Sequence, residues 1–246
     1  TGEKTTETLT SGGTIEYTST VTAQSKGTTI SNQTTAGTLT VKVTMNGKSA
    51  SKSATIYQAG NYVTALNIAV GSMSYPAIAA GGGTSTPSNG ANTVTYHFSS
   101  GSTSTTAPAS TYGSLSTTTS YSWPGASGLF TALNTSTGAI TASSKGTTAS
   151  GATTSPTVTK TVKSTWTPTA SYNAAGTKTI SGTKTATASQ NANAATYGTP
   201  TVSMTYGDIP AKGGSVTPTV SFSQSVTWSS GSTQTVTSGG SKSWSG

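Results

Sequence analysis

Hydrophobic and polar residues alternate along several stretches of the chain. Apolar side chains occupy every second position from Leu39 to Met45, and Thr or Lys fills the positions between them. The same two-residue period recurs in residues 94–98 and 216–228. This period places successive side chains on opposite faces of a strand, so each stretch predicts a half-buried β-strand. We find no stretch with the 3.6-residue period of an amphipathic helix.

Turn signals separate the predicted strands. Asn46-Gly47 directly follows the first of them, and this dipeptide is a strong hairpin signal. Glycine runs at 81–83, 213–214 and 239–240 predict turns or bulges. Only 30% of the residues are hydrophobic and 7% are charged, and the polar positions are filled largely by Thr, Ser and Gly. Because Thr is β-branched and favours pleated surface, this composition predicts an all-β fold.

Segments of the chain recur. Residues 75–87 match residues 206–218 at a constant offset of 131, with Tyr, Ile, Gly, Gly, Thr and Pro at the same places. Three further pairs are alike, namely 23–29 with 142–148, 54–61 with 186–193, and 8–13 with 235–240. Large aromatic residues hold equivalent positions after the last pair: Tyr17, Trp123 and Trp244. Repetition of this kind predicts several copies of one structural unit.

The order of these matches predicts the domain boundaries. We expect residues 1–61 to be a repeat that lacks its first strands, 62–72 a linker, and 73–193 a complete repeat that encloses Tyr96 and Trp123. Residues 194–203 are expected as a second linker, and 204–246 as the opening strands of a third, truncated repeat. Half a sandwich cannot bury both inner faces. The parent protein is therefore expected to continue beyond both ends, or another chain to supply the missing strands.

Two segments resemble a known family. Residues Asn134–Thr148 look like the core signature of bacterial immunoglobulin-like domains of group 2, in which a polar-Gly turn leads into a short strand and then a Gly-Thr pair. Residues 38–48 with 56–61 are similar to the last strands of Ig-like repeats in phages and in surface proteins of gut Bacteroidetes. The resemblance implies tandem immunoglobulin-like Greek-key β-sandwiches. It carries over no binding residue, because the family has no shared site motif that this sequence matches.

The resemblance also implies a function and a location. In phages such domains are virion-surface appendages on capsid, tail or fibre proteins, and are thought to adhere to host-surface or mucus glycans. We therefore expect a non-catalytic structural or decoration module of a virion surface. The alternative is the stalk or tip of a bacterial cell-surface adhesin. Expected partners are other virion or surface proteins in a homo-oligomeric or multi-copy assembly, with carbohydrate as a further candidate.

Charge changes this picture little. The 12 basic residues are all Lys and the acids number 4, which gives a formal charge of +8. An anionic partner such as nucleic acid or an acidic glycan is one explanation. We favour a thinly charged surface, because the Lys residues are scattered and specific nucleic-acid recognition depends on Arg. The chain has no Cys, which excludes disulfides and thiolate metal sites. No apolar stretch is long enough to span a membrane.

Catalytic chemistry lacks the necessary side chains. The titratable acids and bases near neutral pH are His97, Asp208 and three Glu within the first sixteen residues. A Ser–His–Asp constellation would have to join His97 to Asp208, which belong to different repeats. Clusters that could bind calcium or zinc are also missing. We therefore predict no enzyme, no catalytic residue, no metal and no cofactor.

Two aromatic residues remain as candidate glycan contacts. Trp166 and Tyr197 have no clear counterparts in the other repeats, whereas the repeated aromatics are expected to support each core. Aromatic faces stack on sugar rings, so these two residues are the candidates. For Trp166, burial in a core is the favoured alternative.

Overall fold

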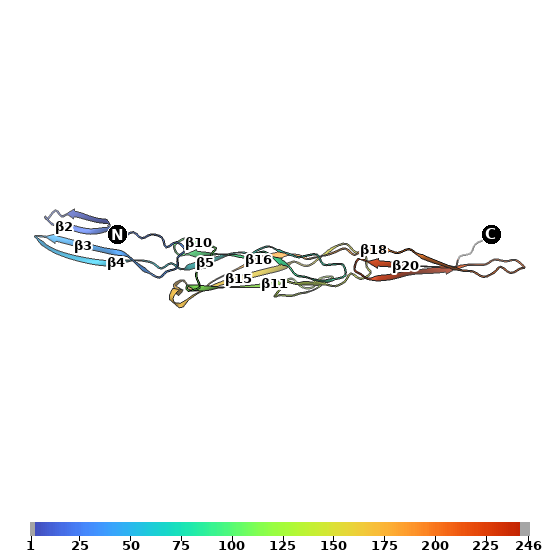
Figure 1. Ribbon diagram of the computed structural model, residues 1–246. Helices are drawn as coiled ribbons and strands as arrows, with labels where there is room; N and C mark the ends of the chain where they lie inside the picture. The colour runs from blue at the N-terminus through green and yellow to red at the C-terminus, as the bar shows by residue number, and fades with distance from the viewer. Residues whose placement is uncertain (1–2, 242–246) are drawn as a thin grey trace. The chain divides into compact units, whose positions relative to one another are not determined.

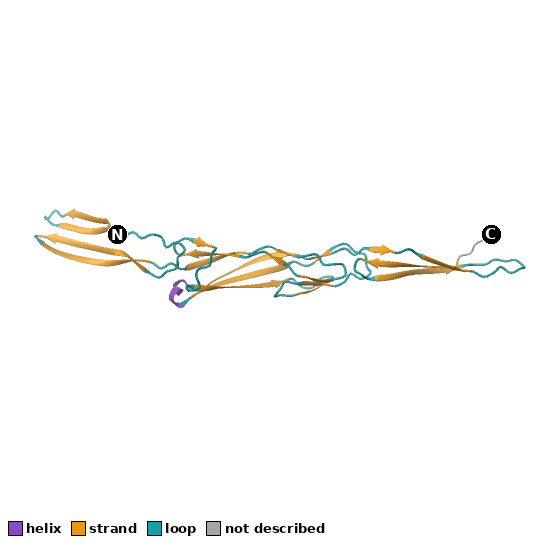
Figure 2. Ribbon diagram, viewed as in Figure 1, coloured by secondary structure: helices purple, strands orange, loops and turns teal. Residues whose placement is uncertain are grey.

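Strands dominate the computed structural model, which describes residues 3–241. Of the chain, 54% is strand and 3% is helix, and the strands form antiparallel sheets. Within residues 3–241, the one helical segment is the short 3₁₀ helix η1, Ala170–Ala175 (Figure 2). The predicted all-β fold is confirmed.

The first sheet has the strand order β1-β2-β3-β4. Its strands are β1 (Glu3–Thr8), β2 (Thr14–Thr20), β3 (Thr34–Met45) and β4 (Lys48–Gln58). The long β3–β4 hairpin lies at the blue end of the chain in Figure 1. Asn46 and Gly47 connect these two strands with φ values of 49° and 72°. Positive φ at both central residues matches the twist of the flanking strands, so the predicted hairpin is confirmed.

The chain divides into two compact units, each made of three segments. Unit 1 comprises Thr1–Val70, Asn92–Thr118 and Val162–Gly182, and unit 2 comprises Gly71–Ala91, Thr119–Thr161 and Thr183–Gly246. The strands β11 (Gly113–Ser122), β15 (Val158–Pro168) and β16 (Lys178–Ala186) form one sheet, in the order β11-β15-β16. Each of the three contributes residues to both units.

A second sheet in unit 1 has the order β10-β9-β5. Its strands are β5 (Val63–Ala69), β9 (Thr93–Phe98) and β10 (Thr103–Ser104). The core of this unit consists of Ile30, Val63, Leu66, Tyr96, Phe98 and Trp166. Every second residue of β15 from Val158 to Trp166 is buried, as the strand period requires.

The described residues of unit 2 form four smaller sheets. The strands are β6 (Met73–Ser74) with β8 (Ser88–Asn89), β7 (Gly83–Ser85) with β13 (Ile140–Ala142) and β12 (Phe130–Leu133), and β14 (Thr153–Thr154) with β17 (Ser189–Gln190). The fourth sheet joins β18 (Ala195–Tyr197), β19 (Thr201–Thr205), β20 (Thr219–Trp228) and β21 (Thr233–Ser241). The core of unit 2 consists of Met73, Ile78, Tyr121, Phe130, Ile140, Ala142, Val158 and Ala188.

The structure differs from the expected boundaries in two respects. The expected linkers are not free of strands, because 62–72 contains β5 and 194–203 contains β18 and part of β19. The range 73–193 does not form one compact unit, since its residues 92–118 and 162–182 belong to unit 1. Tyr96 is buried in the core of unit 1, whereas Trp123 packs partly buried against the core of unit 2. Trp244, the third aromatic of that set, lies outside the described residues.

Pairs of hydroxyl groups link neighbouring strands. Thr40 and Ser53 Oγ atoms lie 2.9 Å apart across β3 and β4, and Thr44 and Ser49 repeat the arrangement at 2.7 Å. Three further pairs are Thr84 with Thr141, Thr117 with Ser164, and Thr165 with Thr179. Cross-strand pairs are the unit of sheet stabilisation, and here uncharged hydroxyls supply them.

Candidate functional site

Asn61 holds three segments of unit 1 together. Its Nδ2 donates to the carbonyl oxygens of Gly27 (2.9 Å) and Thr29 (3.0 Å). Its Oδ1 accepts from the backbone N–H of Ser100 (2.9 Å) and from the hydroxyl of Ser99 (3.0 Å). The side chain is buried, and these four bonds satisfy its whole hydrogen-bonding capacity. We call this arrangement the asparagine junction.

Unit 2 contains the same junction, built around Asn193. Its Nδ2 donates to the carbonyl oxygens of Gly146 (2.9 Å) and Thr148 (3.0 Å). Its Oδ1 accepts from the N–H of Ser230 (2.8 Å) and from the hydroxyl of Ser229 (3.2 Å). This asparagine is also buried.

The bonded residues are those that recur in the sequence. Asn61 and Asn193 end one matched pair of segments, and the two Lys-Gly-Thr-Thr motifs supply the carbonyl acceptors. Ser-Ser-Gly-Ser in 99–102 and 229–232 supplies the two donors. Even the main-chain details agree, because Ser31 exchanges backbone hydrogen bonds with Asn61 as Ser150 does with Asn193. The side chains of the junction have no acid–base function near neutral pH, so the arrangement suits structural connection.

A glutamine next to each junction behaves differently in the two units. Gln58 Nε2 donates to the carbonyl of Gln24 at 2.7 Å, and Gln190 makes the equivalent bond to Ser143 at 2.8 Å. Gln190 also reaches the carbonyls of Ala79 (3.2 Å) and Ala80 (3.4 Å). The loop containing these two alanines therefore covers Gln190, which is fully buried, whereas Gln58 is partly exposed.

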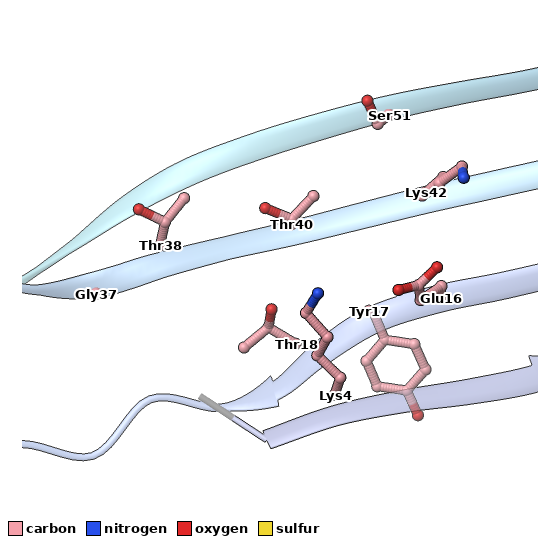
Figure 3. A pocket seen from close by; sticks show the side chains of 9 residues that line it. All are labelled: Lys4, Glu16, Tyr17, Thr18, Gly37, Thr38, Thr40, Lys42 and Ser51. Atoms are coloured by element: carbon pink, nitrogen blue, oxygen red, sulfur yellow. The ribbon is translucent and has the colours of Figure 1, made fainter. Parts of the chain in front are cut away.

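The pocket in Figure 3 lies where β2 and β3 separate. The two strands pair with each other from Thr14 to Tyr17 of β2. Beyond Tyr17, β2 stays paired with β1 alone, and the facing part of β3 stays paired with β4 alone. The pocket has a volume of about 570 Å³, and Thr18, Thr38 and Thr40 line its middle. Its charged residues are Lys4, Glu16 and Lys42. The carboxylate of Glu16, the two lysine amines and the hydroxyl groups make the lining of this pocket polar.

The two candidate glycan contacts lie in opposite environments. Trp166 is only 2% exposed, and its ring meets Tyr96 edge-on with centroids 5.7 Å apart. A buried ring cannot stack on a sugar, so the structure corrects this candidate to a core residue. Its place follows from the period of β15, which directs Trp166 inward with Val162. Tyr197 is 64% exposed on β18, and its role as a glycan contact stays a prediction.

His97 and Asp208 are not brought together by either compact unit. His97 belongs to unit 1 and Asp208 to unit 2. His97 lies on β9 with its Nε2 buried and without a hydrogen-bond partner, whereas Asp208 is exposed. Within residues 3–241 there is no group of three or more His, Cys, Asp or Glu side chains placed to hold a metal ion.

Lys160 is a buried cation that sequence reasoning missed. It occupies an inward position of β15, where the strand period alone would place an apolar residue. Its Nζ donates to the carbonyl oxygen of Gly71 at 3.1 Å. Burial lowers the pKa of the Lys160 ammonium, and the nearby charge of Lys184 lowers it further. The alternation of residues 158–166 was the signal that could have identified it.

Replacing Lys160 with Met should raise the free energy of unfolding by about 1 kcal/mol at pH 7, because a chain of similar length fills the site without a buried charge. The lowered pKa of the folded state means that stability associated with Lys160 is present above pH 10.5 and is lost as the pH falls through the folded value. The advantage of Lys160→Met should therefore disappear above pH 10.5. Urea denaturation at several pH values measures it, with exposed Lys163→Met as the control. A loss of stability in Lys160→Met at pH 7 would contradict this account.

Comparison with models of protein families, with curated proteins and with solved structures gives no match. Over the described part of the chain, none of the helical structure has the length and apolar character needed to cross a membrane. The duplicated junction is therefore the strongest evidence on function.

Proposed function

We propose that the chain is a non-catalytic structural module of a repeated surface appendage. The observation that carries this proposal is the asparagine junction, which is built twice in one chain from matching residues. A catalytic protein needs one set of reactive groups, whereas a spacer needs one connection made repeatedly. Asn61 and Asn193 each join three separate segments without any reactive group, which suits the second role.

The finer form of this proposal is a tandem array of immunoglobulin-like Greek-key sandwiches. Its support is the antiparallel all-β fold, the two separate hydrophobic cores, and the agreement of the matched segments in their hydrogen bonds. The resemblance of residues 134–148 to group 2 bacterial Ig-like domains adds to it. The array belongs on a virion surface of a phage, attached to a capsid, tail or fibre protein. The stalk of a bacterial adhesin is the alternative that the same resemblance allows.

Immunogold electron microscopy tests the location. Antibodies raised against the chain are applied to purified virions and to cell envelopes from the source in which the chain is encoded. Regularly spaced label on virions is the expected result, and label on cell envelopes alone would support the adhesin stalk. Label confined to the cell interior would contradict a surface module of either kind.

A further inference from the structure

We propose that residues 204–216 of one molecule dock onto unit 1 of a second molecule, so that copies of this chain join head to tail. This inference rests on the proposed structural function and specifies its partner. The docking segment is residues 204–216, and the acceptor site is formed by residues 21–26 together with 56–59 of the second copy. Both surfaces have counterparts in unit 2 that are in contact with each other.

The filled arrangement is seen in unit 2. Residues 73–85, the counterparts of the docking segment, lie against residues 140–145 and 188–191. Ile78 donates its N–H to the carbonyl of Ser189 and accepts from the N–H of Asn191, both at 2.8 Å. The N–H of Lys145 donates to the carbonyl of Ala80 at 2.9 Å. Strand β7 then pairs with β13, which places Thr84 opposite Thr141.

The acceptor site in unit 1 has the conformation of its filled counterpart. Gly27 has a φ of 56° and Gly146 a φ of 57°. Lys26 Nζ donates to the carbonyl of Asn32, as Lys145 Nζ donates to that of Gly151. This turn of the acceptor site is therefore formed before docking, which lowers the cost of association.

A pocket of about 430 Å³ lies where unit 2 has its loop. Ala23, Ser25, Lys26, Gln58 and Ser100 are among its lining residues. Their counterparts in unit 2 meet the loop of residues 79–82: Gln190 and Lys145 bond to it, and a Cβ placed on Gly81 would lie 2.7 Å from Ser230 O. The pocket of unit 1 is thus lined by the counterparts of residues that contact this loop in unit 2.

The docking segment already holds the bound shape. Gly213 and Gly214 have φ values of 82° and 145°, against 84° and 130° for Gly82 and Gly83. The N–H of Gly213 donates to the carbonyl of Pro210 at 2.8 Å, which reproduces the bond from Gly82 to Ala79 at 3.0 Å. Met204 pairs with Val220 at the same offset as Met73 with Asn89.

Apolar side chains of the docking segment are exposed where their counterparts are buried. Ile209 is 58% exposed and Ile78 is 3% exposed. Met204 is 55% exposed and Met73 is 7% exposed. Exposed apolar side chains of a preformed segment mark an interaction surface, and docking onto the edge strand β4 supplies main-chain hydrogen bonds as well. Because the docking segment and the acceptor site are different surfaces, the contact is heterologous and gives chains rather than closed pairs.

Residues 210–213 of the docking segment differ from the loop of residues 79–82 at two positions. Pro210 replaces Ala79, which contributes a carbonyl oxygen to the contact, and proline keeps that group. Lys212 replaces Gly81, where an added Cβ would lie 2.7 Å from the Ser230 carbonyl oxygen, so the backbone at the equivalent contact must shift when the segment docks. Lys212→Gly should therefore strengthen association.

Association is measured by analytical ultracentrifugation of the purified chain over a range of concentrations. We expect concentration-dependent oligomers in the unaltered chain. Ile209→Asp should weaken association about 100-fold, because it removes a buried isoleucine from the contact and places a carboxylate there. Val236→Asp, at an exposed position outside the docking segment, is the matched control and should leave association unchanged. Thermal unfolding of each variant shows that the free chain still folds.

Crosslinking tests the register, since the chain has no Cys. Thr84 and Thr141 have hydroxyls 3.0 Å apart, and their counterparts in the docking segment and acceptor site are Ser215 and Thr22. A mixture of Ser215→Cys and Thr22→Cys molecules should form a disulfide-linked pair on mild oxidation. Ser51→Cys replaces Thr22→Cys as the control, because Ser51 lines the other pocket.

Three outcomes would overturn the docking. The first is a monomer at every concentration, without the Ser215–Thr22 crosslink. The second is an oligomer that Ile209→Asp does not weaken. The third is a crosslink within a single molecule when both cysteines are on one chain, which would place the segment on its own unit 1. None of these alters the immunogold result, so failure of the docking and failure of the surface function are distinguishable.

Discussion

Replacing Trp166 with alanine should lower the free energy of unfolding by about 3–5 kcal/mol, the range for a large aromatic residue removed from a core. Trp166 packs among Ile30, Val63, Leu66 and Phe98 and meets Tyr96 edge to face. Neighbouring backbone approaches it closely, because a Cβ on Gly113 would lie 2.5 Å from the Trp166 ring. Urea denaturation, followed by the far-ultraviolet circular dichroism of the backbone, measures the loss of stability.

The matched control is Tyr197→Ala, which removes an exposed aromatic ring. Its effect on stability should stay within about 0.5 kcal/mol, as expected for a surface substitution. Equal effects of the two substitutions would show that Trp166 is not a core residue. Binding to immobilised glycans, measured for the same two variants, separates the roles: only Tyr197→Ala can lower it without unfolding the chain.

Replacing Asn193 with alanine should cost about 3–4 kcal/mol. The substitution leaves the carbonyl of Thr148 and the N–H of Ser230 without their side-chain partner and removes one of the two side-chain bonds to the carbonyl of Gly146. Partly buried groups that lose their partners are expensive. The loss should exceed that of Asn61→Ala, because Asn61 lines a pocket through which water can replace its bonds. Denaturation of the two variants under one condition compares them.

Asn134→Ala serves as the control for the loss of an asparagine itself. Asn134 Oδ1 accepts from the N–H groups of Ser136 and Thr137, but in an exposed turn. Its replacement should cost no more than about 1 kcal/mol, since water can satisfy both donors. A loss in Asn193→Ala no larger than this would show that the junction does not hold unit 2 together.

Local patterns predicted the strands better than their grouping. The period from Leu39 to Met45 and the Asn46-Gly47 turn specify a hairpin, because both signals act over a few residues. The domain boundaries expected at 62–72 and 194–203 depend on long-range contacts and not on local signals. They assumed that a compact unit is a continuous stretch of chain, whereas β11, β15 and β16 contribute to both units. Matching segments in a sequence show which residues are equivalent, but not which strands they contact.

The site shows the same division. The equivalence of Asn61 with Asn193 was visible in the sequence. The four side-chain hydrogen bonds of each asparagine, however, depend on segments that lie far apart in the chain. Around Asn193, for example, Gly146 and Ser230 are 84 positions apart and in contact with each other. The lack of a counterpart made Trp166 a candidate glycan contact, whereas the alternation of β15 places its side chain in the core. Lys160 escaped notice because a charged residue normally indicates a surface position.

The hydroxyl pairs between strands differ from ion pairs in how they depend on salt concentration and pH. A pair such as Thr40 with Ser53 has no net charge, so dissolved ions do not screen it as they screen an ion pair. Hydroxyl groups also keep one protonation state over the whole physiological pH range. Sheets linked by such pairs should therefore depend little on salt concentration, and little on pH over this range.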